Sequence, residues 1–148
     1  MPAKFHEPSI KSGLKNKRKL SAFIDKIIKK HKKSIKMAQI NYIFCDDDFL
    51  LQLNKQYLNH DTLTDIITFD LSETDELILI GEIYISIERV KENALKYGVN
   101  YDDELLRVIF HGILHLCGLK DKKQEDIKLM RENEDRCIEE FKKELVAV

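Results

Sequence analysis

The 148-residue chain has few residues that interrupt regular structure: five glycines, two prolines and no tryptophan. Both prolines fall within the first eight residues, so we expect few long loops in the rest of the chain. No apolar run approaches the roughly 20 residues of a membrane-spanning helix. No apolar segment follows the first charged residues, as one would in a secretory signal. These absences argue against a membrane protein and against a secreted one.

Cysteine is scarce as well, and its positions show no paired spacing. Cys45, Cys117 and Cys137 are an odd number of thiols, which argues against a disulfide framework and favours a reducing cytoplasm. We expect Cys45 and Cys137 to be buried as small apolar residues.

The residues that are present describe one globular domain, residues 1–148, since 43% are hydrophobic and 34% are charged. Strands are expected over 3–6, 37–45, 65–71 and 77–85, and helices over 14–33, from Asp46 or Asp47 onward, between Ser86 and Gly98, and over 103–117 and 124–143. Runs of strands followed by runs of helices predict an α+β fold, in which a small mixed sheet of about four strands is packed by about five helices.

Several details of these segments can be tested. The strands over 65–71 and 77–85 are expected to pair as a hairpin, and Gly81 marks either a bulge or a close approach of another segment. Each helix is expected to bury one side. These sides include Phe49, Leu50, Leu53 and Tyr57 in the second helix, Tyr97 in the third and Ile127 in the fifth.

The helix over 103–117 is apolar nearly all round, which predicts a buried helix. His111 and His115 are four residues apart and project from one side of it, so both imidazoles can reach one metal ion. Gly118 can end the helix and reverse the chain, which would return Asp121 toward the histidines as an oxygen ligand. Three protein ligands and an open position are typical of a catalytic metal site, here at the end of the helix. The alternative is that both histidines are ordinary core or surface residues.

Two neighbouring residues argue against a cysteine ligand and against a zinc-protease motif. Cys117 stands six residues after His111 and on a helix points away from the histidine side, so we interpret it as a core cysteine. Gly112 stands where zinc proteases of the His-Glu-x-x-His kind carry their general base. A different base, or metal-bound hydroxide alone, would have to do that work.

The sequence HGILHLCG over residues 111–118 resembles the histidine motif of the YbeY family of metal-dependent endoribonucleases, also called rRNA maturation factors. Two further segments resemble family motifs in the same order. Residues 53–69, with Asp61 between the two matching ends, resemble a block of the form LNxxYR…DxPTDVLSF, and residues 81–86 resemble a GDIxIS strand. The likeness extends from about residue 37 to the C-terminus.

The resemblance implies a cytoplasmic single-strand endoribonuclease acting in ribosomal RNA processing and ribosome quality control. Its expected partners are RNA, in particular the small-subunit precursor, and the ribosome or ribosome-associated proteins. His111, His115 and Asp121 would hold one divalent ion, most simply zinc, with iron, manganese or nickel as alternatives. The two histidines would act through metal-bound water, and the ion would polarise a phosphoryl oxygen. The competing hypotheses are a noncatalytic ribosome-assembly factor with a structural metal, and a metal-dependent hydrolase of a non-RNA substrate.

Two positions depart from the family pattern. Asp121 stands where the family has a third histidine, and we favour it as the ligand over a shifted motif that has lost this ligand. Leu58 stands where the family has an arginine suited to binding phosphate. Lys55, His60 or Lys120 could replace that arginine, although for His60 we favour a plain loop residue.

The formal net charge of −1 conceals two oppositely charged parts of the chain. Residues 1–36 carry 12 basic and 2 acidic side chains, a net charge of +10, and the rest carries −11. A lysine-covered helix can follow a phosphate backbone, so we favour RNA contact over a merely solvated surface or a membrane-surface helix. The expected RNA-binding residues are Lys29, Lys30, Lys32, Lys33, Lys55 and Lys120.

Overall fold

The computed structural model describes residues 1–60, 62–72 and 77–147, so Asp61 of the second family motif and most of the polar loop at 72–76 lie outside the described residues. The described elements follow the order β1 (Ala3–His6), α1 (Lys17–His31), β2 (Met37–Cys45), α2 (Asp47–Leu58), β3 (Ile66–Asp70), β4 (Ile78–Ser86), α3 (Ile87–Tyr97), α4 (Tyr101–Leu116) and α5 (Gln124–Val146). The expected α+β class is confirmed, and the expected bounds agree within three residues.

The four strands form one mixed sheet in the order β1-β2-β4-β3. β1 and β4 both run parallel to β2, whereas β3 pairs with β4 in the antiparallel direction expected of a hairpin. The β3–β4 register runs without interruption to the pair Asp70 and Gly81, so Gly81 does not mark a bulge. β1 pairs only with Ile40–Ile43, which leaves residues 37–39 of β2 paired on one side only.

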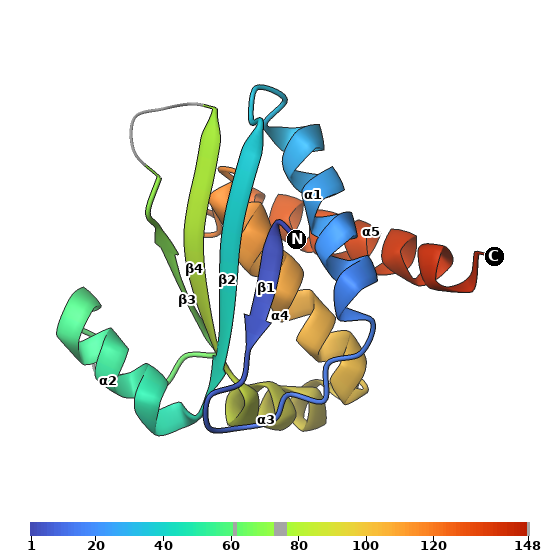
Figure 1. The fold of residues 1–148 in the computed structure, drawn as a ribbon. Helices are drawn as coiled ribbons and strands as arrows, with labels where there is room; N and C mark the ends of the chain where they lie inside the picture. Colours follow the sequence, from blue (N-terminus) through green and yellow to red (C-terminus); the bar gives the residue numbers. More distant parts are fainter. Residues whose placement is uncertain (61, 73–76, 148) are drawn as a thin grey trace.

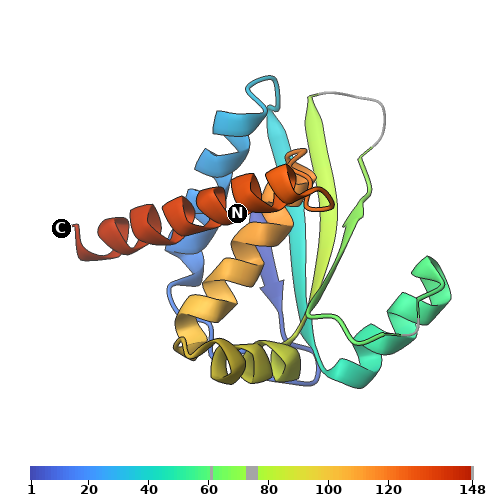
Figure 2. The same ribbon diagram turned by 180° about the vertical axis from the view of Figure 1, so that it is seen from behind.

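Helices α1, α4 and α5 lie on one face of the sheet, and α5 runs across the outer side of the other two (Figures 1 and 2). This arrangement buries α4 between the sheet and α5, as its apolar composition predicts: ten of its 16 residues are buried. Burial of each leucine, isoleucine or phenylalanine contributes about 1.5–3 kcal/mol, so α4 is held firmly in place.

Two glycines allow α4 to lie close against the sheet. A Cβ atom at Gly112 would stand 2.9 Å from Ile83 Cγ2 and 3.1 Å from Ile66 Cδ1, and one at Gly81 would stand 2.6 Å from Leu116 Cδ1. The close approach expected at Gly81 is therefore confirmed. The same packing explains Gly112, because the glutamate of a zinc-protease motif has no room at that position.

The helix boundaries follow from local hydrogen bonds that the sequence predicts. The side chain of Asp46 accepts a hydrogen bond from the Phe49 N–H at 2.8 Å, and that of Ser86 accepts one from the Arg89 N–H at 3.2 Å. Gly98 ends α3 at a φ of 67°, a conformation that favours glycine. None of the helices in the described ranges is long and apolar enough to cross a membrane.

Four expected core positions are wrong, since Phe49, Tyr57, Tyr97 and Ile127 are 47%, 59%, 59% and 51% exposed. Helix α2 lies at one end of the sheet (Figure 1) and buries only Leu50 and Asn54. Tyr97 is the last residue of α3, and Ile127 precedes the first residue of α5 that the core buries. Phe49 and Tyr57 do contact the sheet, through the rings of Tyr84 and Phe69, but nothing in the described ranges covers their outer sides. Periodicity identifies the inward side of a helix but not how completely that side is covered.

Candidate metal centre and adjoining pocket

The expected ligands lie at the end of α4 and in the turn that follows it. His111 and His115 occupy the last two turns of the helix, and Gly118 follows at a φ of 105°. The Gly118 N–H donates to the His115 carbonyl at 3.0 Å, and the Leu119 N–H donates to the Leu114 carbonyl at 3.1 Å. This glycine turn ends the helix and directs the chain back toward Asp121, as the sequence predicts.

His111 and Asp121 face each other. His111 Nε2 lies 3.3 Å from Asp121 Oδ2. Two ligands of a tetrahedral zinc ion, each about 2.1 Å from the metal, are about 3.3–3.4 Å apart. The separation and the chemistry of this nitrogen–oxygen pair therefore fit a divalent cation.

The opposite nitrogen of His111 is held by Glu134, a buried residue of α5. His111 Nδ1 and Glu134 Oε2 are 2.7 Å apart, and the other oxygen of Glu134 accepts from Arg107 Nη1 at 3.0 Å. A carboxylate behind a histidine fixes the ring with its proton on Nδ1 and leaves the Nε2 lone pair for a metal.

Sequence reasoning missed Glu134. The signal that could have found it is an acidic residue on the inward side of α5, where Met130, Cys137 and Ile138 are apolar. A carboxylate on the buried side of a helix needs a partner, and here the partners come from α4.

His115, the third expected ligand, makes no polar contact with the pair formed by His111 and Asp121. Its ring is exposed and stacked nearly parallel to that of His111, with an interplanar angle of 7° and centroids 6.2 Å apart. In the described ranges no group of three or more His, Cys, Asp or Glu side chains is arranged to hold a metal ion. The structure thus brings together two of the three expected ligands.

The electrostatic surroundings of His111 are strongly negative. Burial alone would lower the pKa of His111, but the Glu134 hydrogen bond and the charges of Glu134, Asp121 and Asp65 outweigh it and raise the pKa. Surroundings that favour a proton on this imidazole also favour a divalent cation beside it.

A pocket of about 160 Å³ adjoins His111 where β3, α3, α4 and α5 meet. Its lining includes His111, Glu134 and Arg107, together with the carboxylates of Asp65 and Glu104. Burial raises the pKa of Asp65, and burial together with the charge of Asp65 raises the pKa of Glu104. Asp65 belongs to the second family motif. The sequence does not mark Glu104 as a site residue, because it falls in the first turn of a helix, where acidic residues are common.

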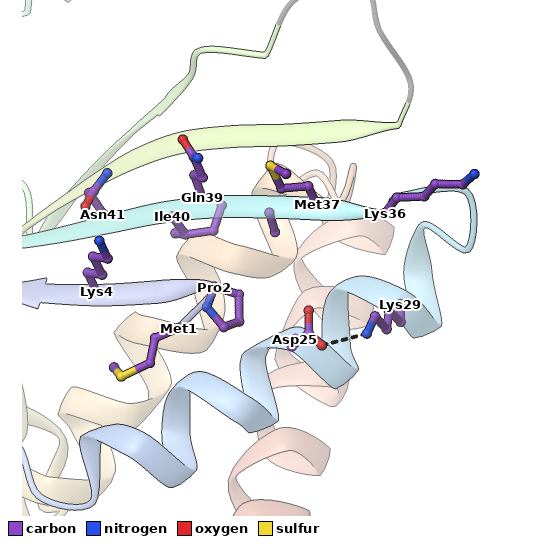
Figure 3. Close-up of a pocket in the computed structure, with 11 residues that line it drawn as sticks. Met1, Pro2, Lys4, Asp25, Lys29, Lys36, Met37, Gln39, Ile40 and Asn41 are labelled. Carbon is purple, nitrogen blue, oxygen red and sulfur yellow. Dashed lines mark ion pairs between the residues drawn. The ribbon is translucent and has the colours of Figure 1, made fainter.

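A larger cavity, of about 560 Å³, lies at the opposite edge of the sheet between α1 and the part of β2 that β1 does not cover. Figure 3 shows Lys4, Lys29 and Lys36 around it, with Lys29 paired to Asp25 at 2.8 Å. Lys4 and Lys36 form no ion pair with any residue in the described ranges.

Three of the six lysines expected to contact RNA lie in different surroundings. Lys29 lines the cavity, Lys30 lines a narrow groove against α5, and Lys55 lies on α2. Leu58, at the end of α2, is 45% exposed, and no side chain that lines the pocket beside His111 comes from α2.

The cysteines are confirmed as core residues, because Cys45, Cys117 and Cys137 are all buried free thiols. Burial raises the pKa of Cys117 to about 11, with the positive charge of Lys32 opposing the shift. A thiol that resists ionisation in this way is a poor metal ligand.

Three comparisons bear on the identity of the chain. The sequence profile of the family described as "Endoribonuclease YbeY" matches residues 7–142. Among relatives with that name, the protein of Flavobacterium psychrophilum is 58% identical over 70% of this chain and 73% of its own length. The relative from Cytophaga hutchinsonii is 45% identical over 90% of this chain and 92% of its own length. The solution structure of a Thermotoga maritima protein, 31% identical, superposes with a TM-score of 0.62 and covers 97% of this chain and 91% of that one.

Proposed function

The chain belongs to the YbeY family of endoribonucleases, and from this premise we propose how its residues cleave RNA. Its function is that of an endoribonuclease in ribosomal RNA processing. The substrate is RNA. We propose further that it acts on single-stranded segments of the small-subunit precursor in the cytoplasm, in association with the ribosome.

His111, His115 and Asp121 are the residues proposed to hold a divalent metal ion. The observation that carries the proposal is the 3.3 Å approach of His111 Nε2 and Asp121 Oδ2, with Glu134 behind the other ring nitrogen. His115, from the same histidine motif over residues 111–118, is the third ligand of the proposed set. When bound, such an ion supplies Lewis acidity for attack on a phosphodiester.

The protein side chains prepare the site for that ion. Glu134 holds the proton of His111 on Nδ1, and Arg107 keeps Glu134 in place through its 3.0 Å ion pair. The carboxylate of Asp121 adds one negative charge where the family motif has a neutral imidazole. That charge makes manganese or iron a closer competitor to zinc, since carboxylate ligands suit the harder ions.

The RNA backbone is proposed to be held by the basic N-terminal part of the chain, including Lys29 and its neighbours Lys4 and Lys36. Leu58 cannot donate hydrogen bonds to a phosphate, so positive charge must be provided elsewhere. Nonspecific attraction between lysines and phosphates meets this need without a particular geometry.

The experiment that tests the proposal combines metal analysis with cleavage of a single-stranded RNA oligonucleotide. We expect His111→Ala and His115→Ala to lower kcat/KM at least 100-fold and to lower metal content, and a chelator to abolish cleavage of the wild type reversibly. His6→Ala, on β1 at the opposite edge of the sheet, should change neither. Full cleavage by either variant, or full activity after chelation, would contradict the proposal.

The second candidate, a noncatalytic assembly factor, draws support from one observation, the leucine at position 58. Wild-type protein that binds ribosomal RNA and a metal ion but cleaves no single-stranded oligonucleotide would favour it over the endoribonuclease.

A further inference from the structure

The pocket beside His111 contains two carboxylates that the proposed metal site does not use. Glu104 is only 5% exposed, and no side chain in the described ranges forms a hydrogen bond or ion pair with it. The Asp65 carboxylate accepts a hydrogen bond from its own backbone N–H. The oxygens of both residues are not sealed in the protein but open onto the pocket. Carboxylate oxygens that face the pocket can accept hydrogen bonds from a donor that enters it.

The rim of the same pocket offers groups that stack on or pair with a nucleobase. Tyr97 is 59% exposed at the end of α3, Asn93 lies one turn earlier, and Arg131 approaches from α5. Tyrosine rings and arginine planes are the usual platforms for unstacked bases of single-stranded RNA. The side-chain amide of Asn93 can donate as well as accept.

We propose that this pocket takes a guanine base of the RNA substrate, with Glu104 and Asp65 as hydrogen-bond acceptors and Tyr97 as the stacking surface. The inference rests on the proposed function and specifies the nucleotide that the site selects. Of the four bases, guanine alone presents two adjacent N–H donors, N1–H and N2–H, on its Watson–Crick edge. A carboxylate, which only accepts hydrogen bonds, matches that pair.

The other three bases fit these acceptors less well. Uracil presents one N–H between two carbonyl oxygens, which two carboxylates repel. Adenine and cytosine each present an amino group next to an acceptor nitrogen, so one carboxylate oxygen is left unpaired. The volume of about 160 Å³ suits a single base.

The position of the pocket ties base selection to cleavage. His111 and Glu134 line the pocket and also form the proposed metal centre. A nucleotide whose base occupies the pocket therefore has its own phosphates beside that centre, and we expect the cleaved bond to be one that flanks the guanosine.

The test uses the full-length protein and seven-residue oligouridines with one central guanosine, inosine or uridine. Inosine lacks only the N2 amino group, so it removes one charge-assisted hydrogen bond. We expect kcat/KM for the flanking bonds to be about tenfold lower with inosine than with guanosine, and lower still with uridine. The same order is expected for binding, measured by fluorescence anisotropy after chelation.

Variants decide whether the pocket causes the preference. Glu104→Gln should reduce the guanosine-to-inosine ratio to about twofold or less, whereas Glu132→Gln, an exposed residue next to Arg131, should leave it unchanged. Tyr97→Ala should weaken binding of the guanosine and inosine oligonucleotides alike, because stacking does not depend on the N2 amino group. The ratio is measured within one variant, so partial unfolding does not alter it. Equal cleavage and binding of the three oligonucleotides by the wild type would overturn the inference and leave the endoribonuclease intact. A protein that binds guanosine selectively but cleaves nothing would overturn the proposed function alone.

Discussion

The pocket beside His111 and the cavity beside Lys29 lie at opposite edges of one sheet, next to β3 and β1 respectively. The pocket is small, and four carboxylates lie in or beside it: Asp65, Glu104, Asp121 and Glu134. The cavity has more than three times the volume, and its charged wall consists of three lysines and Asp25.

The opposite charges of the pocket and the cavity suit two different requirements of RNA cleavage. A polyanion is attracted by positive charge, which the N-terminal part of the chain supplies without precise placement. A metal ion and a base with N–H donors need negative groups at fixed positions, and these come from packed helices. The acidic part of the molecule is therefore the one in which the position of each group matters most.

Substitution at the contact between α4 and the sheet should give the largest change in stability. Gly112→Ala would place a methyl group 2.9 Å from Ile83 Cγ2 on a helix that the core cannot easily move. Because overpacking of a core costs about 1–3 kcal/mol, we expect a loss of about 2 kcal/mol in the free energy of unfolding, measured with urea.

The corresponding substitution at the cavity is the control for this prediction. Lys4→Ala, on the wall of the cavity, should change the unfolding free energy by less than about 0.5 kcal/mol. If Gly112→Ala also stayed within that range, the contact between α4 and the sheet would have room for a methyl group, and the absence of a side chain at position 112 would not be needed for close packing.

Removal of positive charge at the cavity should have the next largest effect. Lys4→Gln, Lys29→Gln and Lys36→Gln combined should weaken binding of a single-stranded RNA about tenfold at low salt. The slope of log K against log salt should fall by about 2, since each lost phosphate contact on single strands contributes about 0.7. Metal content should be unchanged, because these residues lie at the other edge of the sheet.

A second triple variant with the same change in charge tests whether the RNA contacts the cavity or the end of α1. Lys30→Gln, Lys32→Gln and Lys33→Gln neutralise the C-terminal end of α1 and the residues that follow it, away from the cavity lining. A larger loss of RNA affinity in this variant would show that the RNA follows the end of α1 and not the cavity.

The fold could be predicted from the sequence because its signals are local. Alternation marks β2 and β4, the capping side chains of Asp46 and Ser86 mark two helix starts, and Gly98 marks a helix end. His111 and Asp121 could be named for the same reason, since one helix and one glycine turn relate them.

The rest of the site depends on contacts between distant segments. Glu134 is 23 residues from His111, and Glu104 meets Asp65 only because α4 packs against the start of β3. Neither acidic residue is unusual in its own helix. Their roles follow from tertiary packing, which no periodicity contains.

The smallest predicted effect lies in the pocket and has the opposite sign. Burial and the charge of Asp65 raise the pKa of Glu104, so its ionised form destabilises the folded protein at neutral pH. Glu104→Gln should therefore increase the unfolding free energy by about 1 kcal/mol at pH 7. As the pH falls through the raised pKa toward the ordinary value of 4.5, the wild-type carboxyl becomes protonated in the folded state and the advantage of the variant disappears.

Urea unfolding of both proteins at pH 7 and pH 4 measures this difference in stability, with Glu132→Gln as the exposed control. A variant that is less stable at pH 7 would mean that Glu104 has a partner within the protein. A more stable variant that has also lost its preference for guanosine would mean that the protein sacrifices stability here to recognise its substrate.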